Sequence, residues 1–106
     1  MSLILISAGF DAYFDDPLAG MRVSAPQFER LTSAICAVAD RVCDGKVVAV
    51  SEGGYNLAGL NECIQAAISG LDGSAGVGHP APNGPTARGD ACLAAVKPQI
   101  AKYWTV

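Results

Sequence analysis

The sequence predicts an α/β fold, because two short apolar segments alternate with two longer segments of helical periodicity. Residues 3–7 and 46–51 are rich in aliphatic and β-branched side chains, and a glycine-containing turn follows each of them. We therefore expect two strands, each followed by a helix. This order is the βαβ pattern, in which a helical crossover makes the two strands parallel and the connection right-handed.

The helical segments have recognisable start and stop signals. Ser24 and Gln27 form a capping-box pair before apolar residues at helical spacing, and this helix is expected to end near Gly45. Its apolar positions are Phe28, Leu31, Ile35, Val38 and Val42. Asn56 can cap a second helix that ends at about residues 70–73. The apolar face of the second helix contains Leu57, Leu60, Ile64, Ala67, Ile68 and Leu71.

The last third of the chain is predicted to be a Gly/Pro loop at about residues 72–89 and a closing helix at about 90–104. We expect His79, the single histidine, to be a solvated side chain of that loop. Pro98 lacks an amide hydrogen and is expected to kink or restart the closing helix. Tyr103 and Trp104 are expected to pack as an aromatic anchor.

The predicted sheet is incomplete on its own. Both strands are apolar at successive positions, which is typical of strands covered by helices on both faces. Two parallel strands alone would leave long apolar edges unpaired, and natural proteins seldom do so. We therefore expect the remaining strands to come from a missing N-terminal part of the same domain, or from self-association through the sheet edges.

Composition excludes several classes of function. The net charge of −3 leaves no basic stripe for nucleic acid, and no apolar run approaches the roughly 20 residues that a membrane-spanning helix needs. No signal-peptide pattern is present and the cysteines lack framework spacing, so we expect a cytoplasmic protein. The four cysteines are expected to be small buried hydrophobes; they are Cys36, Cys43, Cys63 and Cys92.

Two residues are candidates for chemistry because of their distance from the strands. Ligands of open α/β sheets bind beyond the carboxyl ends of the strands. Asp11 lies a few residues beyond the first strand, and Tyr55 lies at the matching distance beyond the second. If the strands are neighbours, both side chains project into one cleft.

Two motifs resemble a known family. Ser-Ala-Gly-Phe-Asp-Ala (7–12) with Asp-Pro-Leu (16–18), followed by Glu-Gly-Gly-Tyr-Asn-Leu (52–57), is similar to the paired signatures that end the histone deacetylase and acetylpolyamine amidohydrolase domain. The resemblance covers nearly all of residues 1–106. It implies the C-terminal portion of a parallel-sheet, arginase/deacetylase-like fold in a zinc-dependent hydrolase that cleaves the acetyl-amide bonds of acetyl-lysine or acetylpolyamines.

The resemblance also implies roles for individual residues. Asp11 matches a zinc ligand of the family, and Tyr55 matches the catalytic tyrosine, whose hydroxyl donates a hydrogen bond to the oxyanion. Gly53 and Gly54 would let the backbone approach the substrate closely. Asp16, before Pro17, is expected to fix the loop that presents Asp11.

The sequence departs from the family pattern in ways that matter. A catalytic zinc needs three protein ligands, and the family takes two of them from an upstream Asp-x-His motif that this chain lacks. The family's pair of catalytic histidines is also missing, and Tyr13 stands where many relatives have His. We therefore expect the chain to be inactive by itself.

Other interpretations of these residues remain open. Asp11 could cap a turn, and Tyr55 could pack on the sheet. Asp15 and Asp16 could join Asp11 in a carboxylate cluster for a hard cation. The chain as a whole could be a non-catalytic remnant that self-associates, or an α/β module that binds an anion on the amides before its second helix.

Overall fold

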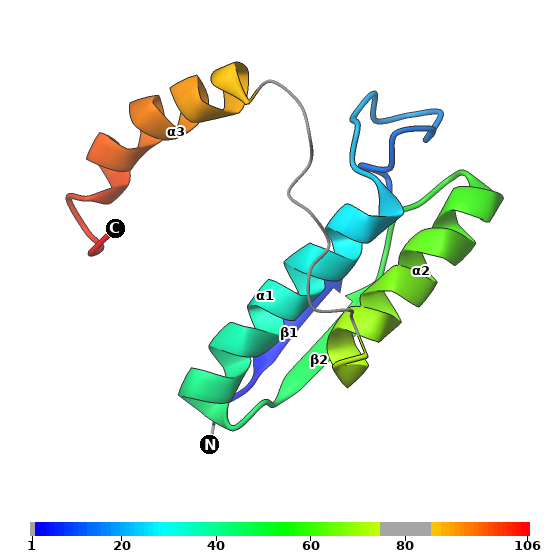
Figure 1. Ribbon diagram of the computed structural model, residues 1–106, viewed down its shortest axis with the longest axis horizontal. Coiled ribbons are helices and arrows are strands. Elements are labelled where there is room, and N and C mark those ends of the chain that lie inside the picture. The colour runs from blue at the N-terminus through cyan, green and yellow to red at the C-terminus, as the bar shows by residue number, and fades with distance from the viewer. Residues whose placement is uncertain (1, 75–85) are drawn as a thin grey trace.

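The computed structural model describes residues 2–74 and 86–106 and confirms the α/β prediction (Figure 1). Its elements are β1 (Ile4–Ala8), α1 (Ala25–Cys43), β2 (Val47–Ser51), α2 (Leu57–Asp72) and α3 (Ala87–Ile100). β1 and β2 are parallel neighbours, with Ile4 opposite Val47 and Ala8 opposite Ser51. His79 and most of the predicted Gly/Pro loop lie outside the described residues.

The predicted caps hold the two central helices. At the start of α1, the backbone amide of Ser24 donates to the Gln27 side chain at 2.7 Å. At the start of α2, the Asn56 side chain accepts from the amide of Gly59 at 2.9 Å. α2 ends at Gly73, whose φ of 77° is left-handed. Glycine adopts this conformation without steric strain because it has no Cβ.

One face of the two-stranded sheet is uncovered. α1 and α2 pack against each other and lie on the same side of β1 and β2 (Figure 1). In β1, partly buried and exposed residues alternate, as expected when helices cover a single face. The other face carries large apolar side chains that are 49–66% exposed, namely Leu3, Leu5, Val48 and Val50. The chain is therefore an incomplete piece of an α/β sheet fold.

The core lies at the end of the sheet where both strands finish. Its buried cluster contains Phe10, Tyr13, Phe28 and Cys63. The rings of Phe10 and Phe28 meet edge to face, with centroids 5.2 Å apart. Phe10 and Tyr13 belong to the loop after β1, whereas Phe28 and Cys63 belong to the helices. The loop that carries Asp11 is thus anchored in the best-packed part of the molecule.

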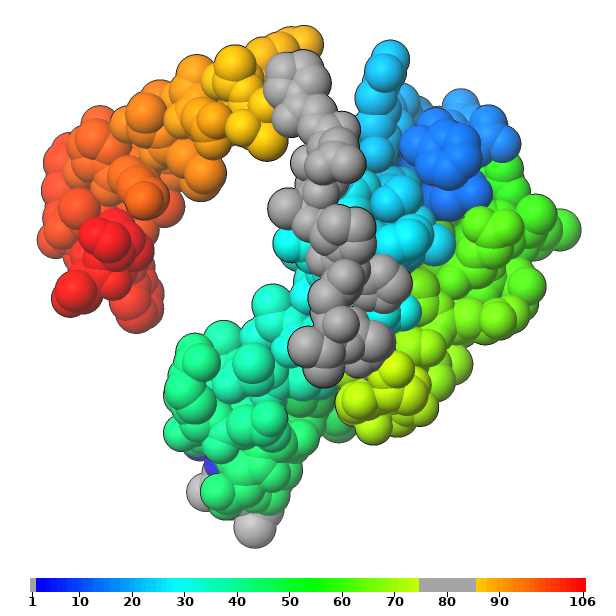
Figure 2. All heavy atoms as spheres, viewed as in Figure 1, coloured from blue at the N-terminus to red at the C-terminus, as the bar shows by residue number. Residues whose placement is uncertain are grey.

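The structure differs from two expectations about the C-terminal segment. α3 runs from Ala87 through Pro98 to Ile100 as one helix, so the helix does not restart at Pro98. Tyr103 and Trp104 are 81% and 71% exposed, so they are not a packed anchor. All residues of α3 are exposed, and Figure 2 shows this helix standing apart from α1.

The cysteine prediction is correct only for part of the set. Cys43 and Cys63 are buried and Cys36 is intermediate, but Cys92 lies on α3 and is exposed. All four are free thiols. Over the described ranges, no helix has both the length and the apolar character needed to cross a bilayer.

Candidate functional site

The turns after β1 and β2 are joined by hydrogen bonds that continue the pairing of the strands. The Glu52 amide donates to the Ala8 carbonyl at 3.0 Å, and the Phe10 amide donates to the Gly53 carbonyl at 2.7 Å. The Ser7 hydroxyl donates to the Glu52 carboxylate at 2.6 Å. The two glycine-bearing turns therefore form one continuous surface at the carboxyl edge of the sheet, where ligands of such sheets bind.

Asp11 rests on the glycines of both turns. A Cβ at Gly53 would lie 3.0 Å from the Asp11 carboxyl carbon and 3.2 and 3.3 Å from its two oxygens. A Cβ at Gly9 would lie 3.1 Å from one of the same oxygens. Within residues 2–74 and 86–106 the carboxylate has no hydrogen-bond donor. The half-buried Asp11 side chain is thus held in place by packing, with its oxygens available to a ligand.

Gly54 sets the direction in which the chain enters α2. Its φ is 141°, a backbone conformation that residues with a side chain rarely adopt. A Cβ there would also meet the Leu60 side chain at 2.8 Å and the Phe10 Cβ at 3.3 Å. Contacts within this chain thus explain both Gly53 and Gly54, and their expected role in substrate binding stays a prediction.

Tyr55 follows directly and carries its side chain into the open. The residue is 57% exposed, and its hydroxyl has no partner in the described part of the chain. Its backbone, in contrast, is fixed, because the Tyr55 amide donates to the Asp16 carboxylate at 2.9 Å. An immobilised backbone with a free phenol is a suitable arrangement for a hydrogen-bond donor to a bound substrate.

Asp16 connects the two turns through a single carboxylate. One oxygen accepts from Tyr55, and the other accepts from the amides of Leu18 and Ala19 at 2.8 and 3.3 Å. Burial of this side chain would raise the pKa of Asp16, but the three amide donors outweigh it and hold the pKa below its usual value. We expected Asp16 to fix only its own loop, so its bond to the second loop was missed.

Asp15 makes a second connection between the loops. The Asn56 side-chain amide donates to the Asp15 carbonyl at 3.0 Å and to its carboxylate at 3.1 Å. Adjacent acidic residues thus bind adjacent residues of the second turn. The structure gives the carboxylate-cluster interpretation no support, since Asp15 and Asp16 are engaged with donors of this chain and no cluster of three ligands occurs in the described residues.

Tyr13 has a structural environment. Its ring packs so closely on Gly59 that no side chain fits there, and its hydroxyl donates to Glu62 at 3.3 Å. Burial, followed by the charge of Glu62, raises the pKa of Tyr13 above its usual value. Tyr13 thus holds the loop after β1 onto α2 through its contact with Gly59 and its hydrogen bond to Glu62.

The described residues do not make a complete metal centre. No group of three or more His, Cys, Asp or Glu side chains is placed to hold an ion in residues 2–74 and 86–106. A catalytic zinc requires three protein ligands, and Asp11 is one carboxylate. By itself, this part of the chain does not fit a zinc ion.

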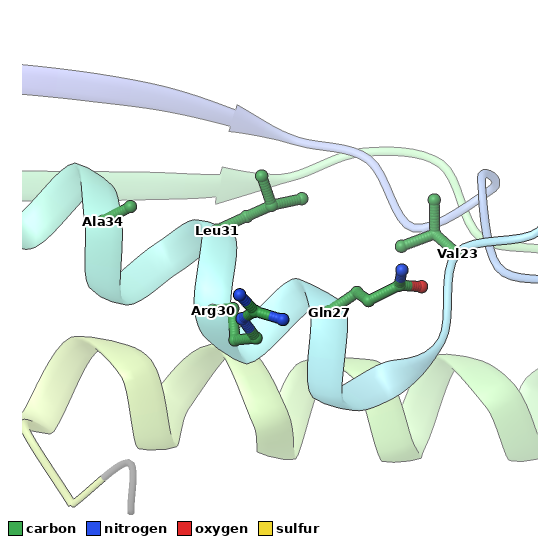
Figure 3. A pocket seen from close by; sticks show the side chains of 5 residues that line it. All are labelled: Val23, Gln27, Arg30, Leu31 and Ala34. Carbon is green, nitrogen blue, oxygen red and sulfur yellow. The ribbon is translucent and has the colours of Figure 1, made fainter. Parts of the chain in front are cut away.

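A separate hollow lies along the start of α1 (Figure 3). It has a volume of about 420 Å³ and is lined by Val23, Gln27, Arg30, Leu31 and Ala34. Neither Asp11 nor Tyr55 lines it. The hollow is thus distinct from the surface where the two turns meet.

Comparison with known proteins identifies the family to which the chain belongs. The family model described as the histone deacetylase domain matches residues 2–71, which include both turns and the two strands before them. The chain belongs to the histone deacetylase family. This result confirms the resemblance found in the two glycine-bearing motifs.

The relatives of this histone deacetylase family member differ in what their names describe. The chain is 44% identical over 69 residues to the type-2 histone deacetylase 1 of Dictyostelium discoideum, covering 65% of this chain and 5% of the relative. It is 35% identical over 97 residues to the human polyamine deacetylase HDAC10, covering 90% of this chain and 13% of the relative. The chain therefore spans only a small part of these relatives.

A solved structure agrees with the fold. The structure of the histone deacetylase Clr3 superimposes with a TM-score of 0.80 at 25% identity, over 96% of this chain and 16% of that chain. This match confirms that the strands and helices form a segment of a histone deacetylase fold. The uncovered sheet face of this chain is consistent with such a segment.

Proposed function

We propose that this chain forms the oxyanion-binding side of a zinc-dependent deacetylase, which hydrolyses acetyl-amide bonds once the rest of the domain is present. Tyr55 donates the hydrogen bond to the oxyanion, and Asp11 supplies one carboxylate ligand to the zinc. The remaining ligands and the histidine pair come from a part of the domain outside this chain. Alone, the chain is inactive.

One observation supports this proposal most directly: Asp11 and the turn that bears Tyr55 form a single surface. The Asp11 carboxylate packs on Gly53, two residues before Tyr55, and both side chains keep their polar atoms available in the described part of the chain. An acceptor for a cation beside a donor for an oxyanion is the combination that amide hydrolysis uses.

The proposed activity needs a partner and a substrate of a defined class. The partner is the amino-terminal part of the domain, which would cover the exposed apolar side chains of β1 and β2, and the substrate is an acetylated amine. The names of the relatives divide between histone and polyamine deacetylases, so both acetyl-lysine and acetylpolyamines belong in an assay. Free thiols are compatible with the cytoplasmic location that we propose.

The anion-binding alternative receives little support from the geometry. The amides of Tyr55 and Gly59 at the start of α2 already donate to Asp16 and Asn56. These two donors are therefore not available to a phosphate. Self-association through the sheet edges remains the second hypothesis, because the edges and the outer face of the sheet are open in the described residues.

The decisive experiment combines this chain with the amino-terminal part of a deacetylase domain that contains the Asp-x-His motif. Acetate release would be measured from an acetyl-lysine peptide and from an acetylated polyamine. Tyr55→Phe should lower kcat by about 100- to 1000-fold, the usual effect of losing one oxyanion donor. Asp11→Ala should abolish turnover.

Tyr103→Phe is the matched control, because it removes the same hydroxyl from an exposed tyrosine beyond the matched residues 2–71. It should leave turnover unchanged. Full activity of the Tyr55→Phe complex would refute the role proposed for Tyr55, and full activity after Asp11→Ala would refute the role proposed for Asp11.

A further inference from the structure

We infer that Asp16 is a positioning residue for Tyr55, which it holds in the geometry for catalysis by accepting the Tyr55 backbone amide across the two loops. This inference rests on the proposed function, since it gives Asp16 a role in the reaction only if Tyr55 acts on the substrate. The residues are separated along the sequence but joined by one hydrogen bond of 2.9 Å.

The hydrogen bond from the Tyr55 amide to Asp16 fixes a residue whose side chain is otherwise exposed. Immediately before Tyr55, Gly54 has a φ of 141° and packs on Leu60 and Phe10. The Tyr55 side chain itself is 57% exposed, so packing does not fix the ring. The position of the backbone therefore sets where the Cα–Cβ bond of Tyr55 points, and Asp16 is the group that holds the Tyr55 amide.

Asp16 is well suited to this task because it is itself immobilised. The side chain is 9% exposed, and its second oxygen is held by the amides of Leu18 and Ala19. The low pKa of the Asp16 carboxyl, which results from these donors outweighing burial, keeps it ionised at neutral pH. A charged acceptor makes a stronger hydrogen bond than a neutral one.

The consequence for catalysis follows from the length of the tyrosine side chain. The phenol hydroxyl is far from the Cα atom, so a small rotation of the backbone displaces the hydroxyl by a larger distance. A misplacement of about 1 Å can cost about 100-fold in rate. Asp16 thus influences the oxyanion donor without touching the substrate.

Asp16→Asn removes the hydrogen bond to Tyr55 while keeping those to Leu18 and Ala19. The asparagine oxygen can still accept from Leu18 and Ala19, but its NH2 group then faces the Tyr55 amide, and two donors cannot bond to each other. The turn within the first loop is kept while the bond to Tyr55 is lost. Asp15→Asn is the matched control, because it removes the same charge from the neighbouring residue, which bonds to Asn56 instead.

The first test uses NMR on the isolated 106-residue chain and needs no activity. In the unmodified chain, the Tyr55 amide proton should titrate with the Asp16 carboxyl, with a midpoint below the usual aspartate range. In Asp16→Asn, the exchange of that amide with solvent should accelerate about 10- to 100-fold, as expected for the loss of a charged hydrogen bond. The Leu18 and Ala19 amides should stay protected.

The second test measures kinetics in the completed enzyme described above. Asp16→Asn should lower kcat about tenfold to 100-fold with little change in KM, because the lost interaction acts on the transition state. Asp15→Asn should leave both constants near those of the unmodified complex. A variant that only destabilised the fold would instead lower the active fraction, which active-site titration detects.

These outcomes distinguish the inference from the proposed function. A Tyr55 amide that neither titrates with Asp16 nor changes in Asp16→Asn overturns the inference, even where the variant has not been tested for activity. Unchanged kcat in Asp16→Asn, together with loss of activity in Tyr55→Phe, also overturns it while the function of Tyr55 stands. Unchanged activity in Tyr55→Phe refutes the proposed function instead.

Discussion

The carboxylate of Asp11 is seated on the backbone of Gly53, with only 3.0 Å between its carboxyl carbon and the place that a Cβ at position 53 would take. Gly53 has no left-handed backbone that would itself require glycine. Among the described residues, the nearest atoms to a Cβ at position 53 all belong to Asp11. This relationship makes Gly53 a means of moving Asp11 without mutating it.

Gly53→Ala should displace the Asp11 carboxylate from its seat. We expect zinc affinity of the completed enzyme to fall about 10- to 100-fold, the usual effect of disturbing the support of a metal ligand. Calorimetry with zinc would measure it. Gly89→Ala is the control, because nothing lies within 4 Å of a Cβ there; equal zinc affinity in both variants would contradict the role of Gly53.

The isolated chain should not bind zinc tightly. In the proposed function Asp11 supplies one ligand, and no group of three metal-binding side chains lies in the described residues. Titration calorimetry of the purified chain would test this, with Asp11→Ala as the reference. Tight binding that depends on Asp11 would show that self-association completes a metal site, contrary to the proposed need for the rest of the domain.

The pH dependence of stability should carry the signature of Asp16. Its pKa is lower in the folded chain than in the unfolded chain, so its contribution is present above the ordinary aspartate pKa of about 3.9 and is lost as pH falls through the lower folded value. Urea unfolding of the chain between neutral pH and about pH 2 would show this loss.

Asp16→Asn isolates the part that belongs to this residue. Asp72 also has a lowered pKa, because the side chain and amide of Ser74 bond to it, and so it contributes in the same range. Subtracting the profile of the variant from that of the unmodified chain removes the Asp72 part. If the two profiles are parallel at all pH values, Asp16 does not stabilise the fold through its charge.

Gly70 is predicted to be essential for the close packing of α1 and α2. A Cβ there would lie 2.7 Å from the Thr32 Cβ and 2.9 Å from the Glu29 carbonyl oxygen. Alanine favours a helix over glycine by about 1 kcal/mol, but overpacking against a backbone oxygen that cannot move aside costs about 1–3 kcal/mol. Gly70→Ala should therefore lower the free energy of unfolding in urea.

Gly89→Ala supplies the comparison for this substitution. It places the same methyl group in α3 with open space around it, so helix propensity acts alone and stability should not fall. A stabilising effect of Gly70→Ala would show that the two helices can separate without loss, and it would contradict the packing described for them.

The cysteines should react with thiol reagents in a defined order. Cys92 is exposed on α3 and should react first. Burial, followed by the charge of Glu62, raises the pKa of Cys63, so at about pH 8 this thiol is protonated as well as inaccessible and should react last. Mass spectrometry of partially labelled chain would give the order, and early labelling of Cys63 would disagree with the core.

The sequence was sufficient for the elements and for the residues of the two turns. Apolar runs and the caps at Ser24 and Asn56 predict β1, α1, β2 and α2 to within a residue or two, because each signal is local. The motif that contains Tyr55 is local as well. Membership of the family followed from two such motifs in the right order.

Contacts between distant segments were harder to predict. The bond from Asp16 to the Tyr55 amide depends on how two loops meet in space, and no local pattern encodes that meeting. The packed position of Tyr103 and Trp104 was wrong for a related reason. An apolar residue predicts a need for burial, but whether a surface is available depends on the rest of the fold.

The pairing of β1 with β2 has a further consequence for how the site is made during folding. The strands are parallel, so a short hairpin cannot join them. They pair only after the chain has closed the long connection that contains α1. Contacts between residues so far apart in the sequence form slowly, because the chain loses the entropy of closing the intervening loop before the contacts stabilise it. The turns that carry Asp11 and Tyr55 therefore meet only in the step that forms the sheet. A kinetic intermediate with helices alone would lack the surface that these turns form.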